Sequence, residues 1–172
     1  MSYGYLTQET APKILVEAIK LIGTKEIVGK AHNPVILNWA KELSLSTIYT
    51  NDEIPWCGLF VAYCAHKAGV QVVERPLWAL NWNKYGTQVT EPMLGDILTF
   101  KRNGGGHVGF YVGEDKTHYH VLGGNQSNQV NVMRLAKSRL TQARRTAWKV
   151  AQPASVRKVY LEAKGTISTN EA

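Results

Sequence analysis

The sequence has little cysteine and no long apolar run. Only two of its 172 residues are cysteines, Cys57 and Cys64. If the segment between them is helical, they lie roughly 10 Å apart, too far for a disulfide, so we expect two free thiols, as in a reducing cytoplasm. No stretch approaches the roughly 20 apolar residues of a membrane span, and residues 1–10 are too polar for an export signal. We therefore expect neither an integral membrane segment nor a signal peptide.

The sequence also has no internal repeat and no Cys or His pairs at metal-ligand spacing, so we expect no metal. Basic residues outnumber acidic ones by 20 to 13, which gives a net charge of +7 and favours a polyanionic partner. The densest basic group lacks the interleaved aromatic residues of a base-stacking surface, so we expect no nucleic acid. This group comprises Lys137, Arg139, Arg144 and Arg145.

Helical patterns come first along the chain and strand patterns follow. Apolar spacing predicts helices over residues 12–23, 34–43 and 57–69, then a long aromatic loop with at most short helical pieces over 71–92. Alternating runs predict antiparallel strands at 96–101, 107–112, 119–122 and 130–133, with a further one within 143–150. This order indicates an α+β fold. We expect one catalytic domain over residues 1–150 and a partly flexible extension over 151–172, frayed from Thr166 onward.

Cys57 is the residue best placed to act as a nucleophile. It would lie in the first turn of a helix, where N–H groups and the helix dipole lower a thiol pKa and can stabilise an oxyanion. Cys64 would face nearly the same way two turns deeper, which favours a core position. Taken alone, however, a lone helical cysteine such as Cys57 is more often a small buried hydrophobic residue, and it is His107 that favours the catalytic interpretation.

His107 is the histidine best placed to act as a base. It follows three glycines and opens a strand, so a helix end or a substrate could approach it closely. A Cys–His pair needs a third polar group to orient the imidazole, and a three-residue hairpin turn would bring Asn125 onto the same face as His107. A turn one residue shorter or longer would instead bring His120 or Gln126 there.

Three short blocks surround these residues. They are PWCGLFV at 55–61, GDIL at 95–98 and GHVGFYVG at 106–113, and LGGNQ follows at 122–126. In this order and spacing they resemble the Cys and His blocks of the NlpC and CHAP peptidoglycan hydrolases, over residues 26–148. The likeness is closest to a phage-associated branch of that group.

The resemblance implies a papain-like fold, with the helix that carries the nucleophile packed on an antiparallel sheet. It implies cysteine-dependent cleavage of stem peptides or of the muramoyl-L-alanine amide, without metal or other cofactor, and peptidoglycan and the anionic envelope as partners of a monomer. We expect catalysis by Cys57, His107 and Asn125. The residues expected to line the cleft are Trp56, Trp78, Trp82 and Gln126, although Trp78 and Trp82 could equally be core.

The sequence departs from the group's pattern at three positions. Trp56 and Gly58 stand where many NlpC relatives have Asp and Ser, and Gly123 stands where CHAP relatives often have an acidic residue. The resemblance favours a phage endolysin, made in the bacterial host's cytoplasm and acting on the cell wall. Two other classes stay open: a non-catalytic wall-binding or tail-assembly protein, and a papain-like protease or acyltransferase with another substrate.

Overall fold

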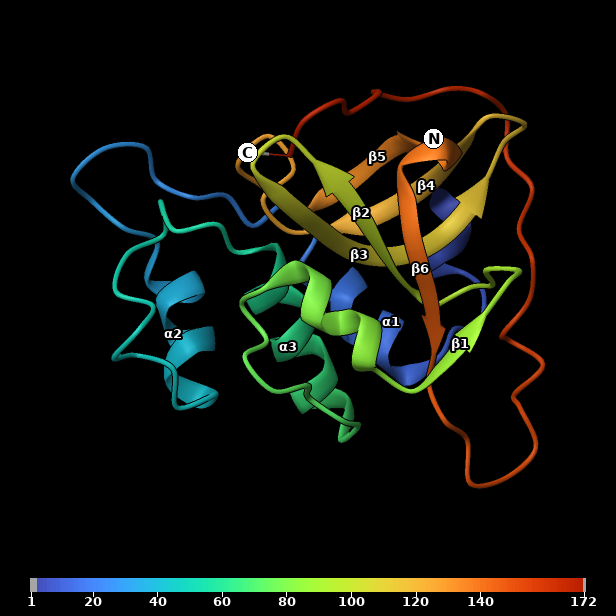
Figure 1. Cartoon of the computed structure of the whole chain (residues 1–172), viewed down its shortest axis with the longest axis horizontal. Helices are drawn as coiled ribbons and strands as arrows, with labels where there is room; N and C mark the ends of the chain where they lie inside the picture. The colour runs from blue at the N-terminus through green and yellow to red at the C-terminus, as the bar shows by residue number, and fades with distance from the viewer. Residues whose placement is uncertain (1–2, 172) are drawn as a thin grey trace.

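The computed structural model describes residues 3–171 as helices on one side and a sheet on the other (Figure 1). The α-helices are α1 (Lys13–Ile19), α2 (Pro34–Glu42) and α3 (Cys57–Ala68), and the 3-10 helices are η1 (Gly4–Thr7), η2 (Ala79–Lys84) and η3 (Lys137–Arg139). The strands are β1 (Thr87–Val89), β2 (Ile97–Arg102), β3 (Gly105–Glu114), β4 (His118–Gly123), β5 (Asn131–Ala136) and β6 (Leu140–Arg145). None of the helices within residues 3–171 is long and apolar enough to cross a membrane.

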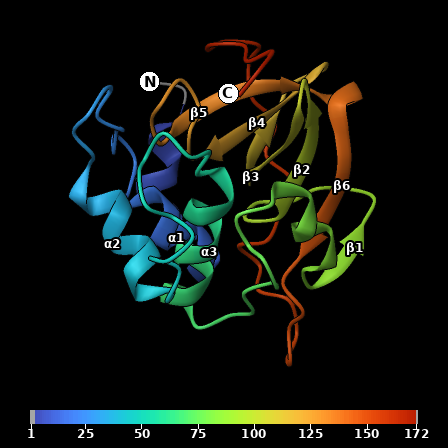
Figure 2. The same cartoon turned by 60° about the vertical axis from the view of Figure 1, so that its left-hand side comes forward.

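The six strands form one antiparallel sheet in the order β1-β6-β2-β3-β4-β5. The α-helices lie together on one side of it, and α3 is the helix that meets the central strand β3 (Figure 2). The predicted α+β fold is therefore confirmed, including the order of helices and strands. The short edge strand β1 was missed because it lies inside the aromatic loop and pairs only with the distant β6.

Local sequence sets the ends of two helices. The side chain of Asn33 accepts a hydrogen bond from the backbone N–H of Val35 at 2.8 Å, and Pro34 occupies the first helical position of α2. Gly69 ends α3 with φ 69°, a left-handed conformation that glycine adopts without steric cost. These signals confirm α2 and α3 to within a residue or two.

Apolar side chains are buried on both faces of the sheet. The face toward the helices forms the main core, whose members include Leu15, Ile36, Trp39, Phe60, Val108 and Phe110. The opposite face forms a smaller core with Leu98, Phe100, Tyr111, Val121 and Leu135. Phe100 is the partner of His107 in the β2–β3 ladder, so the side chain of His107 leaves the strand on the same face as this smaller core.

The β3–β4 hairpin differs from the predicted one. Its closing pair is Glu114 with Tyr119, and a bulge between Tyr111 and Gly113 shifts the register. The ladder then ends at Phe110 and Leu122, and its continuation would set Asn125 opposite His107. The chain leaves the strand there, since Asn125 has φ 57°. A left-handed residue breaks the alternation on which the prediction rested.

The C-terminal segment runs along the outside of the sheet (Figure 1). The backbone of Arg134 in β5 bonds to Thr166 at 2.8 Å and to Ser168 at 3.0 Å. Glu171 is buried and forms an ion pair with Arg139 at 2.6 Å. Residues 166–168 thus bond to β5 and Glu171 pairs with Arg139 of η3, which differs from the frayed tail expected, while Ala172 lies outside the described residues.

Candidate active site

Cys57 is the first residue of α3 and is almost fully buried. The next residue is Gly58, where a Cβ atom would lie 2.3 Å from the carbonyl oxygen of Pro76 and 2.8 Å from that of Leu77. Such contacts are impossible, so glycine is required for the loop to pass this close to the first turn of the helix. The departure from Ser at this position therefore has a structural cause.

The environment of the Cys57 thiol corrects one expectation. Burial raises the pKa of this thiol above its usual value, although the N–H groups of Val108 and Gly58 and the charge of Arg102 act in the opposite direction. The sequence predicted a lowered pKa from the helix end alone. Desolvation is the larger effect here, so the resting cysteine is a neutral thiol. The effect of the Val108 N–H also shows that the thiol lies against β3, one residue from His107.

His107 is fully buried, and its two ring nitrogens differ. Nε2 lies 3.0 Å from Oε1 of Gln126, whereas Nδ1 has no hydrogen-bond partner within residues 3–171. Burial lowers the pKa of His107 to about 4, so the ring is neutral near pH 7. A neutral ring carries one proton and one free lone pair, and the neighbours decide which nitrogen carries which.

The amide of Gln126 fixes the tautomer of His107. Its Nε2 donates to the backbone carbonyl oxygens of Asn131 at 2.8 Å and Val121 at 3.2 Å, and the Asn131 side chain donates to the backbone carbonyl oxygen of Gln126. The amide nitrogen therefore faces acceptors and its oxygen faces the histidine. The proton of His107 must lie on Nε2, and the lone pair lies on Nδ1.

Gly123 makes room for this hydrogen bond. A Cβ atom at Gly123 would lie 2.7 Å from Oε1 of Gln126 and 3.1 Å from Nε2 of His107. The space that a side chain at position 123 would enter is thus occupied by the Gln126 amide.

The other two candidates for the third position lie differently. Asn125 is buried beside the site, but Gln126 is the residue bonded to His107, so Asn125 as the group that orients the ring is corrected to Gln126. His120 bonds through Nε2 to Asp115 at 2.9 Å and through Nδ1 to Tyr3 at 2.6 Å, toward the turn of the hairpin. Gln126 itself was expected to line the cleft and is instead buried beneath it.

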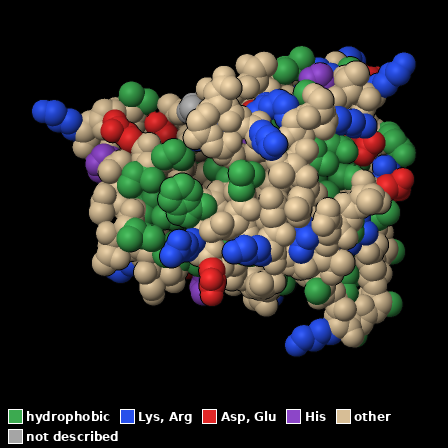
Figure 3. Space-filling view, in the orientation of Figure 1, with side chains coloured by type: hydrophobic (Ala, Val, Ile, Leu, Met, Phe, Trp, Pro, Cys, Tyr) green, Lys and Arg blue, Asp and Glu red, His purple; other side chains and the backbone are tan. Residues whose placement is uncertain are grey.

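A cavity of about 550 Å³ opens over Cys57. Figure 3 shows hydrophobic side chains gathered on this face, over the start of α3 and the loops beside it. The lining residues are Ile48, Ile54, Pro55, Cys57, Leu77, Trp78, Ala79, Arg102 and Gly104 to Gly106. The cavity therefore gives a bulky substrate access to the thiol, along a floor of three glycines.

The three tryptophans expected in the cleft have different positions. Trp78 is 70% exposed and lines the cavity. Trp56 and Trp82 are fully buried, and their indole N–H groups donate to Glu26 at 3.0 Å and to the carbonyl of Pro76 at 2.9 Å. For these two the expected contact with substrate is wrong, because each packs in the core.

Two charged residues near the pair were missed by the sequence reasoning. Arg102 lines the cavity, and its place before the glycine run was the available signal. Glu171 raises the pKa of His107, against the larger effect of burial. Glu171 lies 64 positions after His107 in the sequence, so no local pattern could have indicated this proximity.

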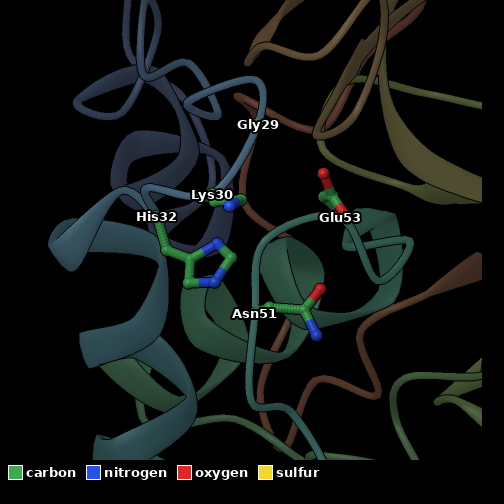
Figure 4. Close-up of a pocket in the computed structure, with 5 residues that line it drawn as sticks. All are labelled: Gly29, Lys30, His32, Asn51 and Glu53. Atoms are coloured by element: carbon green, nitrogen blue, oxygen red, sulfur yellow. The ribbon is translucent and has the colours of Figure 1, made fainter.

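A second, open depression lies between the loops that precede α2 and α3 (Figure 4). It is lined by Gly29, Lys30, His32, Asn51 and Glu53. The neighbouring Asp52 is buried and accepts hydrogen bonds from Asn33 at 2.7 Å and Ile27 at 3.0 Å, which hold the two loops together. No group of three His, Cys, Asp or Glu side chains that could hold a metal ion occurs in the described part of the chain.

Comparison with known proteins agrees with this geometry. Residues 49–125 match the profile of the CHAP domain, and this stretch contains both Cys57 and His107. This match supports an α+β fold of the papain-like CHAP type and, in general terms, a peptidoglycan hydrolase of amidase or peptidase type. No curated protein matches the sequence.

Proposed function

Since residues 49–125 match the CHAP domain, we propose that this protein is a cysteine hydrolase that cuts an amide bond of peptidoglycan with Cys57 as nucleophile and His107 as base. The observation that carries the proposal is the asymmetry of the His107 ring. Nε2 is bonded to Gln126, while the lone pair of Nδ1 is unused among residues 3–171, and His107 directly precedes Val108, the strand residue whose backbone N–H contacts the thiol.

The chemistry follows from the two neutral groups. As the sulfur attacks the amide carbonyl, its proton passes to Nδ1 of His107, and N–H groups in the first turn of α3 stabilise the oxyanion. The imidazolium then gives this proton to the leaving amine, and a thioester on Cys57 remains. Water attacks the thioester with His107 again taking a proton, which releases the carboxylic acid and restores the thiol.

The proposed role of Gln126 is to hold the imidazole in the productive tautomer. Its oxygen accepts the Nε2 proton and, when the ring becomes charged, stabilises the imidazolium without a full negative charge. CHAP relatives often have an acidic residue at the position of Gly123. Here the Gln126 amide fills that space, and we propose that it replaces the missing carboxylate.

We also propose the biological setting of a phage endolysin, a monomer made in the cytoplasm of the bacterial host. The support is the phage-type sequence blocks around Cys57, and the net charge of +7, which favours approach to an anionic envelope. Endopeptidase and amidase activity are both compatible with an open, mainly apolar cavity.

Hydrolysis of purified sacculi, followed by mass spectrometry of the fragments, tests the proposal. The wild type should clear the suspension and release fragments with one new amine and one new carboxylate per cut. Cys57→Ala should release none, while Cys64→Ala, which changes the buried cysteine two turns deeper, should keep activity. Full activity of Cys57→Ala would overturn the mechanism, and binding of sacculi without release by the wild type would favour a wall-binding protein.

A further inference from the structure

We propose that Arg102 forms a subsite for a substrate carboxylate beside Cys57, so that peptides with a free carboxylate near the cut bond are preferred over amidated ones. This inference rests on the proposed function and deepens it. It names the chemical class of the group that must lie next to the scissile amide.

The charge of the cavity is the first support. Arg102 is the only charged side chain among the residues that line it, and the other lining side chains are mainly apolar, including the exposed Ile48 and Trp78. Within residues 3–171 Arg102 forms no ion pair with a carboxylate, although twelve ion pairs occur there. A guanidinium is charged at every physiological pH, so an unneutralised one in an apolar cleft attracts an anion.

The side chain is also held in place before any ligand arrives. Nε donates to the carbonyl oxygen of Gly106 at 3.0 Å, and Nη1 donates to that of Asn103 at 3.2 Å. Nη2 makes no hydrogen bond within the described residues. It lies near Gly105, where a Cβ atom added to the glycine would be 3.9 Å from Nη2. One side of the guanidinium is thus fixed to its own hairpin, while Nη2 is left for a carboxylate oxygen.

The subsite is close to the reacting groups. The positive charge of Arg102 lowers the pKa of both Cys57 and His107, so it is within electrostatic reach of each. A bound carboxylate would offset this charge at both groups.

Peptidoglycan offers a matched pair of groups for such a site. Its stem peptides contain D-glutamate joined through the side-chain carboxyl, which leaves the α-carboxylate free, and in some walls this carboxylate is amidated. The two forms have nearly the same shape and differ in charge. A subsite built on Arg102 would distinguish them, whereas the apolar wall alone would not.

The test combines two enzymes with two substrates. Soluble disaccharide peptides that carry either D-glutamate or D-isoglutamine are cut by the wild type and by Arg102→Gln, and kcat/KM is measured for all four combinations. The wild type should prefer the carboxylate by roughly tenfold to hundredfold, the range of a charge-assisted hydrogen bond, and Arg102→Gln should remove this preference. Lys101→Gln, which removes the same charge from the neighbouring exposed position, should keep the preference.

The outcomes separate the subsite from the proposed function. Equal kcat/KM of the wild type for both peptides, or an equal loss on both in Arg102→Gln, would overturn the subsite and leave the hydrolase intact. Binding of the two peptides to Cys57→Ala gives a readout that does not need catalysis, and the carboxylate form should bind more tightly there by a similar factor. If the wild type cuts neither peptide nor sacculi and Cys57→Ala still prefers the carboxylate, the proposed hydrolysis fails and the subsite stands.

Discussion

Two buried histidines lie in neighbouring strands, His107 in β3 and His120 in β4, and their hydrogen bonds differ in a way that favours His107 as the proposed base. Burial lowers the pKa of both. His120 uses both ring nitrogens, one on Asp115 and one on Tyr3, whereas His107 uses only Nε2. A buried ring nitrogen without a hydrogen bond lowers the stability of the fold. Its presence in His107 is therefore consistent with a role in proton transfer from the Cys57 thiol. The free lone pair of Nδ1, rather than burial or a lowered pKa, is what distinguishes the proposed base His107 from His120.

Replacement of each histidine should give the largest contrast. His107→Ala should lower kcat/KM on sacculi by roughly a thousandfold or more, because the proton acceptor is lost. His120→Ala should keep most of the activity and instead lower the midpoint of thermal unfolding, because Asp115 and Tyr3 lose a partner in the interior. Equal losses of activity in the two variants, at equal folded fraction by circular dichroism, would remove the distinction drawn here.

Replacement of the group that orients the ring should have a smaller effect. Gln126→Leu leaves the Nε2 proton without an acceptor and should lower kcat/KM roughly tenfold to hundredfold. Asn125→Gly, which suits the left-handed backbone at φ 57°, should change it by less than about threefold. The reverse order would restore Asn125 as the third catalytic residue.

Gln126→Glu should keep activity and move the acidic limb of its pH profile to higher pH, because a carboxylate raises the pKa of His107.

The pH dependence should distinguish His107 from an exposed histidine. With a pKa of about 4, the acidic limb of kcat/KM should fall near pH 4 rather than near the ordinary value of 6.5. The unfolded chain takes up the proton first, so stability should decrease as pH falls from about 6.5 to about 4, by up to about 3 kcal/mol from this group. Denaturant unfolding of wild type and His107→Ala at pH 7, 5 and 4 measures this, and a decrease of equal size in both would contradict the assignment.

Local signals made much of this architecture predictable. Asn33, Pro34 and Gly69 marked the ends of helices, and alternation marked the central strands. The prediction failed where distant segments meet. The buried positions of Trp56 and Trp82, and the contact of residues 166–168 with β5, depend on packing between parts of the chain that no local pattern relates.

The site shows the same division. Cys57 and His107 were recognisable from a helix start and a glycine-flanked strand, but their partner depended on a bulge in β3 and a left-handed Asn125. The bulge and the left-handed residue each change which face of the sheet the following side chains occupy. A prediction from strand register that omits them therefore selects Asn125 in place of Gln126 as the neighbour of His107. The prediction of a lowered pKa for the Cys57 thiol failed for a related reason, because the depth at which a side chain is buried depends on the tertiary structure.

Alkylation of the two cysteines tests the central claim most directly. Iodoacetamide should modify Cys57, which lines the cavity, and leave the fully buried Cys64 unmodified, as peptide mass spectrometry can show. Hydrolysis of sacculi should disappear in proportion to the fraction of Cys57 modified, and His107→Ala should slow the modification because the thiol loses its proton acceptor. Sacculi cut at the full rate by protein in which Cys57 is completely alkylated would contradict the account.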